Sequence, residues 1–241
     1  MNTTSPKSRF VAITRWAAIF FLALLPLSVV AVRFSVLPVL PGLGGFAMAC
    51  LGSVVVLIIL IIAAMIPRSK PIRPQLLKTM LITLLPAAVA AATMGGGDNV
   101  PAIHNISTDA TDPPQFVVGI SQRGANSNPL IYTDEVANLQ RAAYPDLTPL
   151  LSELTPEQAF VRASTLVDEM GWKTYAADEN SGRIEAVDTT LWFGFKDDVV
   201  IRIRPSNQGS IVDLRSVSRV GRSDLGANAA RIRNFVDQFE N

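Results

Sequence analysis

An uninterrupted apolar run, LGSVVVLIILIIAAMI at residues 51–66, constrains the fold of this chain more than any other feature. A soluble helix of this length normally carries a polar face, and this run has none. A helix needs about 20 apolar residues to cross the ~30 Å of bilayer hydrocarbon. Residues 16–32 and 76–94 form similar runs. We therefore predict a membrane domain at residues 1–97 with transmembrane helices at about residues 16–32, 46–66 and 76–94.

Charge divides the chain into two different parts. Residues 1–97 hold eight Lys or Arg and no acidic residue, whereas residues 98–241 hold thirteen basic and twenty acidic residues, so the net charge of +1 conceals a half at +8 and a half at −7. Basic residues precede the first span and cluster again at residues 68–78. By the positive-inside rule, both segments are cytoplasmic. Three spans then place residues 98–241 on the far side of the membrane.

Other features of the apolar half narrow its role. Residues 16–32 also fit a signal peptide, but no cleavage site precedes a mature soluble segment. Gly45, Ala49 and Ser53 are spaced by four, which favours close packing within the chain's own bundle over dimerisation. The middles of the spans carry no acidic, histidine or arginine residue of the kind that marks an ion pathway. The only cysteine, Cys50, lies in the second span, so the exported half is expected to fold without disulfides.

The second half, residues 98–241, begins with segments typical of irregular structure. GGGDNVP at residues 95–101 predicts a flexible exit from the membrane, and PAIHNISTDATDPPQF predicts an extended lead-in. LTPEQAFVRASTLVDEMG has a capping-box signature at Thr155 and Gln158, which predicts a helix. A shorter helix is expected near residues 133–143, and a last helix from Ser223 or Asp224 onward.

Between the two stronger helices the sequence predicts strands. They are WKTYAA, RIEAVDTT, LWFGF, VVIRIRP and IVDLRSVSRV, separated by turns that include KDD at residues 196–198. Apolar and polar residues alternate in the last two, the period of half-buried antiparallel strands. If Val199, Ile201, Ile203, Val212 and Leu214 face the core, then Arg202, Arg204, Asp213 and Arg215 face away from it. The expected fold class is α+β, an antiparallel sheet of about four strands with helices on one side.

Arginine and glycine gather at the predicted start of the last helix, in SRVGRSDLGANAARIR. A helix N-terminus exposes unpaired N–H groups and about half a positive charge, so it favours anions. The alternative is a plain helix cap formed by Ser223 or Asp224, with Asp224 paired to an arginine. The hypothetical site for an anion or a partner comprises Arg219, Gly221, Arg222, Ser223, Asp224, Gly226 and Arg231.

Patterns for catalysis or metal binding are few. Asp197 and Asp198 could act as paired carboxylates, although a hairpin turn is the commoner setting for such residues. His104 is the only histidine, which excludes a multi-histidine zinc site within one chain, and we expect no metal and no cofactor. A triad of a serine with His104 and Asp109 or Asp112 lacks a nucleophile elbow. Net negative charge makes nucleic acid an unsuitable partner for this half.

Four ordered segments, PAIHNISTDATDPPQF, QRAAYPDLTPL, FKDDVVIRIRP and SRVGRSDLGANAARIR, resemble the bacterial and plastid family called domain of unknown function 1499. The resemblance covers about residues 101–239 and implies no activity. Asn105 stands where the family usually has aspartate, which argues against joint action of His104 and a neighbouring carboxylate. The motif positions are His104, Asp109, Pro113, Pro114, Tyr144, Pro145, Asp197, Asp198, Arg219, Gly221, Arg222, Ser223, Asp224, Gly226, Asn228 and Arg231.

These features lead to three functional hypotheses. The first is a non-catalytic module of a bacterial inner membrane, with a cytoplasmic N-terminus and a periplasmic second half that binds an anionic small molecule, a lipid headgroup or an envelope protein. The second is an envelope hydrolase that uses Asp197, Asp198 or Asp224 with His104. The third is an assembly factor whose spans pack a larger membrane complex.

Overall fold

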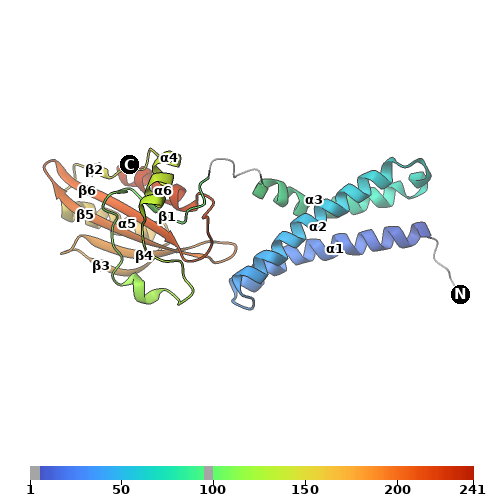
Figure 1. Cartoon of the computed structure of the whole chain (residues 1–241), viewed down its shortest axis with the longest axis horizontal. Helices are drawn as coiled ribbons and strands as arrows, with labels where there is room; N and C mark the ends of the chain where they lie inside the picture. Colours follow the sequence, from blue (N-terminus) through green and yellow to red (C-terminus); the bar gives the residue numbers. More distant parts are fainter. Residues whose placement is uncertain (1–5, 95–99) are drawn as a thin grey trace. The chain divides into compact units, whose positions relative to one another are not determined.

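The computed structural model describes residues 6–94 and 100–241 and divides into two compact units, Met1–Gly96 and Gly97–Asn241 (Figure 1). The first unit consists of α1 (Pro6–Arg33), α2 (Val39–Met65), a 3-10 helix η1 (Pro67–Ile72) and α3 (Arg73–Met94). All three α-helices are long and apolar enough to cross a membrane. Residues 95–99 of the predicted flexible exit at residues 95–101 lie outside the described residues.

Small residues on α2 pack against the neighbouring helices of the first unit. Ala49 and Ser53 are fully buried, and a Cβ added to Gly45 would lie 3.4 Å from Cβ of Ser28 on α1. The ring of Phe21, also on α1, fills the space beside Gly52. The predicted close packing within the chain's own bundle is therefore confirmed.

The second unit is an α+β domain, as predicted. Its elements are β1 (Asn105–Ser107), the 3-10 helix η2 (Gly119–Gln122), α4 (Asp134–Ala143), β2 (Leu150–Ser152), α5 (Pro156–Glu169), β3 (Lys173–Asp178), β4 (Arg183–Thr189), β5 (Lys196–Ser206), β6 (Gly209–Ser218) and α6 (Ala227–Glu240). All strand pairs are antiparallel, in the order β1-β6-β5-β4-β3, and β2 pairs with β6 as well. The two short strands β1 and β2 thus extend the predicted sheet of about four strands to six.

The core lies between the sheet and helices α5 and α6. Alternate residues of β5 and β6 face it, from Val199 to Ile203 and from Val212 to Leu214, as the sequence predicts. Arg202 and Asp213 lie opposite each other on the other face, which also confirms the predicted alternation. On α5, Thr155 and Gln158 form the expected capping box.

Two predictions at the β4–β5 connection are wrong. LWFGF forms a turn rather than a strand, and Lys196–Asp198 forms the beginning of β5 rather than a turn. Leu191 and Trp192 are exposed, whereas Asp197 and Asp198 are buried. Arginine partners from distant segments stabilise the two buried carboxylates, so local sequence suggested the reverse assignment.

The start of the last helix also differs from the prediction. α6 begins at Ala227, and its N-cap is Gly226, whose φ of 84° is favourable only for glycine. Ser223 and Asp224 therefore lie in the preceding loop, not at the N-cap. We call residues 219–226 the corner, because they connect the end of β6 to the start of α6.

Candidate functional site

The second face of the sheet is covered by an irregular segment, residues 113–131, which we call the strap; it is drawn in green between β1 and α4 (Figure 1). Phe116 and Leu130 of the strap pack against Val200 and Val217 of the sheet. Charged side chains of the sheet also bind the strap. The charged residues predicted to face away from the core are therefore partly buried rather than solvated.

Glu185 on β4 fastens one end of the strap. Its fully buried carboxylate accepts N–H bonds from Val117, Val118 and Gly119, at 2.9, 3.2 and 2.6 Å. Arg183 lies 3.2 Å from the same carboxylate. Hydrogen bonds from three backbone donors compensate the burial of this negative charge.

Arg215 on β6 fastens the rest of the strap. Its side chain is almost completely buried and donates to Oδ1 of Asn105 at 3.0 Å, to the carbonyl of Pro114 at 3.0 Å and to the carbonyl of Leu130. The guanidinium also stacks over the ring of Phe116, 5.5 Å from its centroid. Burial lowers the pKa of Arg215 to about 10, so the group remains charged at neutral pH.

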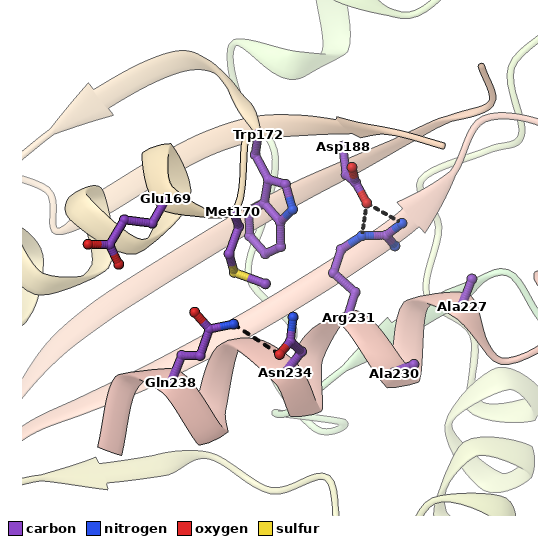
Figure 2. A pocket seen from close by; sticks show the side chains of 9 residues that line it. All are labelled: Glu169, Met170, Trp172, Asp188, Ala227, Ala230, Arg231, Asn234 and Gln238. Atoms are coloured by element: carbon purple, nitrogen blue, oxygen red, sulfur yellow. Dashed lines mark hydrogen bonds and ion pairs between the residues drawn. The ribbon is translucent and has the colours of Figure 1, made fainter. Parts of the chain in front are cut away.

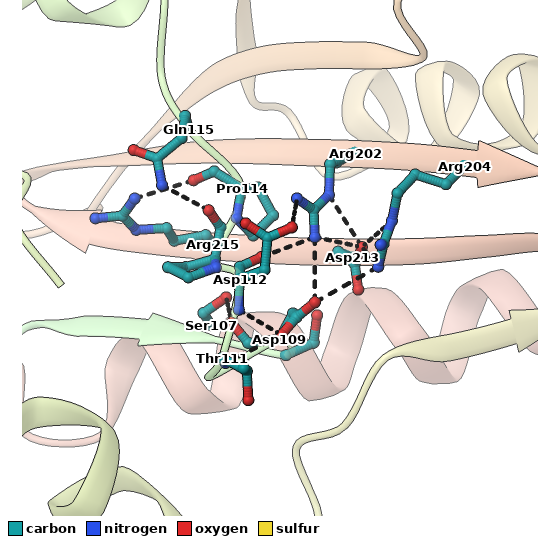
Figure 3. A network of polar contacts seen from close by, with 12 residues as sticks. Ser107, Asp109, Thr111, Asp112, Pro114, Gln115, Arg202, Arg204, Asp213 and Arg215 are labelled. Atoms are coloured by element: carbon teal, nitrogen blue, oxygen red, sulfur yellow. Dashed lines mark hydrogen bonds and ion pairs between the residues drawn. The ribbon is translucent and has the colours of Figure 1, made fainter. Parts of the chain in front are cut away.

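A second set of charges lies farther along the same face (Figure 3). Oδ2 of the buried Asp213 accepts hydrogen bonds from both Arg202 and Arg204, at 2.7 to 3.1 Å. Arg202 also binds Asp112 at 2.8 Å and Asp109 at 3.2 Å. Asp109, a family-motif position, in turn accepts the backbone N–H groups of residues 111 and 112. The motif residue therefore shapes the lead-in rather than lining an open site.

Arg219, the first residue of the corner, is already paired. It donates to Oδ1 of Asp198 at 2.7 Å and to the hydroxyl of Tyr175 at 2.5 Å. Arg123 of the strap binds the other oxygen of Asp198. Asn128 of the strap donates to the carbonyl of Gly221 at 2.8 Å, which ties the strap to the corner. Two arginines thus share one buried carboxylate and leave one excess positive charge.

The N-terminus of α6 also has an internal anion. The carboxylate of Asp224 accepts the N–H groups of Gly226 at 2.9 Å and Asn228 at 3.0 Å. Burial raises the pKa of Asp224 above its ordinary range, against the lowering effect of these two bonds. Ser223 accepts the N–H of Leu225 at 3.1 Å. The helix terminus is therefore already occupied by the Asp224 carboxylate, although the N-cap is Gly226 and not Ser223 or Asp224 as the alternative interpretation expected.

Two cations beside Arg219 have no partner among the residues that the structure describes. They are the exposed side chains of Arg222 in the corner and Lys196 at the start of β5. The two segments are adjacent, because the N–H of Arg219 binds the carbonyl of Lys196 at 3.0 Å. Nδ1 of His104 lies 3.5 Å from the carbonyl of Arg222. Of the predicted site residues, Arg222 is the one whose charge remains available.

Arg231 and Asn228, from the predicted site and the family motif, belong to a separate buried network beneath α6. Arg231 donates to Asp197 at 2.6 Å and to Asp188 at 2.8 Å. Oδ1 of Asn228 accepts from Arg231 at 2.6 Å, and its Nδ2 donates to the carbonyl of His104 at 3.1 Å. This network binds α6 to β4, β5 and the start of β1, which is a structural task.

An open pocket of about 510 Å³ lies beside this network, between the end of α5 and α6 (Figure 2). Its walls include Trp172, Met170 and Gln238, and the Asp188–Arg231 pair forms one side. Glu169 and Asp188 contribute two negative charges and Arg231 one positive charge, so the pocket is unsuited to an anion. Arg231 is the member of the predicted anion site that lines this pocket, whereas the lining residues include none from the corner.

The carboxylates proposed for hydrolysis lie near the start of β1, but each of them already binds other groups. Asp197 binds Arg231, Asp198 binds Arg123 and Arg219, and Asp224 binds backbone N–H groups. A base that must accept a proton from substrate needs an available oxygen. Among the described residues, no cluster of three His, Cys, Asp or Glu side chains could hold a metal ion.

Tyr144, a further family-motif position, is buried in the core. Its hydroxyl has no hydrogen-bond partner within the described part of the chain, and Arg233 lies over its ring, 5.3 Å from the centroid. A Cβ added to Gly226 would lie 3.6 Å from this hydroxyl. Tyr144 therefore supports the corner from within the core.

The sequence did not reveal four residues that bind the predicted site residues or the strap. They are Arg123, Tyr175, Glu185 and Asp188. Asp188 and Glu185 lie on β4 and face opposite sides of the sheet, where Glu185 binds the strap and Asp188 binds Arg231 of α6. Arg123 and Tyr175 had no local signal, because their common partner Asp198 is 75 and 23 positions away.

The family model DUF1499, described as a protein of unknown function, matches residues 105–239. This range begins at β1 and ends within α6, so it covers the whole sheet with its helices and strap. No curated protein matches the chain.

Proposed function

Because this chain belongs to the DUF1499 family, whose description names no activity, we propose its function from its own residues: a membrane-anchored, non-catalytic module that binds an anionic group at the corner. The anchor consists of the three helices able to cross a membrane. The proposed binding residues are Arg222 and Lys196, supported by Arg219 and the backbone of Gly221.

The observation that carries this proposal is the difference between paired and unpaired charges. The predicted catalytic carboxylates bond to arginines or to backbone N–H groups, which favours a structural role for them. Arg222 and Lys196 are exposed and have no partner among the described residues. With Arg123, Arg219, Asp198 and Asp224, they form a group of four positive and two negative charges, a net of +2. Such a surface attracts an anion such as phosphate.

A ³¹P NMR titration of inorganic phosphate into the full chain in a neutral detergent tests the proposal. We expect binding in the millimolar range for the wild type, because both cations are exposed. Arg222→Ala and Lys196→Ala should each weaken it about threefold, since an exposed charge contributes up to ~1 kcal/mol. Arg141→Ala removes an equal charge from α4 and should leave binding unchanged. Equal phosphate affinity in wild type and in the Arg222→Ala, Lys196→Ala double variant would refute the proposal.

A further inference from the structure

Three segments of the second unit converge at one end of the sheet, which we call the loop end. They are the β4–β5 loop at residues 190–195, the corner at residues 219–226 and the start of the unit at residues 100–104. Main-chain bonds connect them: the N–H of Ser218 binds the carbonyl of His104 at 2.9 Å, and the N–H of Asp224 binds the carbonyl of Ile103 at 3.1 Å. The segment that leads from the membrane anchor therefore enters the domain at the loop end.

The loop end exposes large apolar side chains at the tips of its two loops. Leu191 is 80% exposed, Trp192 is 72% exposed, and Leu225 of the corner is 77% exposed. Leu225 has a φ of 54°, a left-handed conformation that non-glycine residues adopt rarely. In the same β4–β5 loop, Phe193 and Phe195 stack on each other with centroids 5.1 Å apart.

Chain length limits how far the loop end can lie from the membrane surface. Val100 follows Met94, the last residue of α3, by six positions. Those residues are at most ~20 Å apart even along a fully extended chain. By contrast, β5 has 11 residues and spans about 36 Å, so the β3–β4 and β5–β6 turns at its far end are much more distant from residue 100.

From these observations we infer that the loop end rests on the bilayer that α1 to α3 span, with Leu191, Trp192 and Leu225 in the headgroup region. Tryptophan is favourable there because its ring contacts acyl carbon while its N–H stays near water, and leucine is favourable because its apolar side chain leaves water. Lys196 and Arg222 lie beside the tips and would contact lipid phosphates. This last contact rests on the proposed function and names its anionic partner as the lipid headgroup.

Charge supports the same orientation. The loop end, through Arg219, Arg222 and Asp224, carries +1, whereas residues 98–241 as a whole carry −7, so the rest of that half carries −8. An anionic bilayer would attract the loop end and repel the remainder. The bilayer is therefore the partner that fits both the apolar tips and the charge of this surface.

Spin labels on the full chain in nanodiscs containing phosphatidylglycerol test the inference. In a Cys50→Ala background, single variants Leu191→Cys and Leu225→Cys place labels on two separate loops. Asn180→Cys and Asn207→Cys place control labels on exposed turns at the opposite end of the sheet. We expect higher collision rates with oxygen than with a water-soluble nickel complex at positions 191 and 225, and the reverse at 180 and 207.

Water-like accessibility at both 191 and 225, equal to that at the control positions, overturns the inference. That result is independent of the phosphate titration, because the labels report on the apolar tips and not on Arg222 or Lys196. If the labels report lipid while Arg222→Ala leaves phosphate binding unchanged, bilayer contact stands and the proposed anion site fails.

Discussion

At the scale of single residues, the arginines of the second unit differ in what they neutralise. Arg219, Arg231 and Arg202 each bind carboxylates. Arg215 is almost completely buried, has no carboxylate partner in the part of the chain that the structure describes, and is stabilised by an amide oxygen, two carbonyls and aromatic rings. Arg222 is exposed. The same residue type therefore serves as an ion-pair partner, as an internal fastener and as a surface charge, and local sequence does not distinguish the three.

Arg215→Met tests the fastening role. The change leaves Oδ1 of Asn105 and the carbonyls of Pro114 and Leu130 without their donor in a buried layer. Each buried acceptor left unpaired costs about 1–3 kcal/mol, partly offset because a buried charge is removed. We expect the free energy of unfolding to fall by about 3 kcal/mol in urea titrations followed by tryptophan fluorescence. Arg141→Ala on exposed α4 is the control, with an expected change within ~0.5 kcal/mol. Unchanged stability of Arg215→Met would contradict the role.

Asp224 gives a prediction for pH. Its pKa in the folded state is raised by burial above the ordinary value of about 3.9. The folded state therefore binds more protons than the unfolded state between these two values, so this group stabilises the fold increasingly as pH falls through its folded pKa. Asp224→Asn lacks this effect. In urea titrations, the unfolding free energy of the wild type minus that of Asp224→Asn should therefore increase from pH 7 to about pH 4. A difference that stays constant or decreases would show that the pKa of Asp224 is not raised in the folded state.

At the scale of elements, the strap depends on Glu185 for its backbone contacts. In Glu185→Gln, one of the two acceptor oxygens is replaced by an NH₂ group. This group is a donor and cannot accept from the N–H groups of residues 117–119. We expect a loss of about 2 kcal/mol in stability. Hydrogen exchange measured by mass spectrometry should become faster in residues 114–122, while β5 and β6 stay protected. Glu179→Gln, in the exposed β3–β4 turn, is the matched control. Unchanged exchange in the strap would mean that Phe116 and Leu130 hold it without Glu185.

The elements also show which parts of the fold are predictable from sequence. The capping box of α5 and the alternation in β5 and β6 depend on residues two to four positions apart, and both predictions are confirmed. The predicted extended lead-in covered only residues 113–116 of the strap, because the strap's partners Glu185 and Arg215 lie 66 to 101 positions away. At the candidate site, the sequence identified the corner but not the pairing of Arg219 with Asp198.

For the whole molecule, the distribution of basic residues predicts a membrane topology. Basic residues in the N-terminal part of α1 and in η1, with no acidic residue among the first 97, favour the cytoplasmic side for both segments. With three helices long and apolar enough to span a membrane, we predict that the second unit lies on the opposite side. In a bacterial inner membrane this side is the periplasm, where the loop end would meet the outer leaflet.

Reporter fusions in a bacterial host test this topology. Alkaline phosphatase, which is active only outside the cytoplasm, should be active when fused after Asn241 and inactive when fused after Lys70 in η1. β-Galactosidase should give the opposite pattern, which controls for unstable fusions. Replacing Arg68, Lys70 and Arg73 by Asn removes the basic residues of η1 and the start of α3, and should reduce phosphatase activity after Asn241, because orientation depends on these charges. Active phosphatase after Lys70 with a stable, inactive fusion after Asn241 would reverse the orientation and place the loop end against the cytoplasmic leaflet.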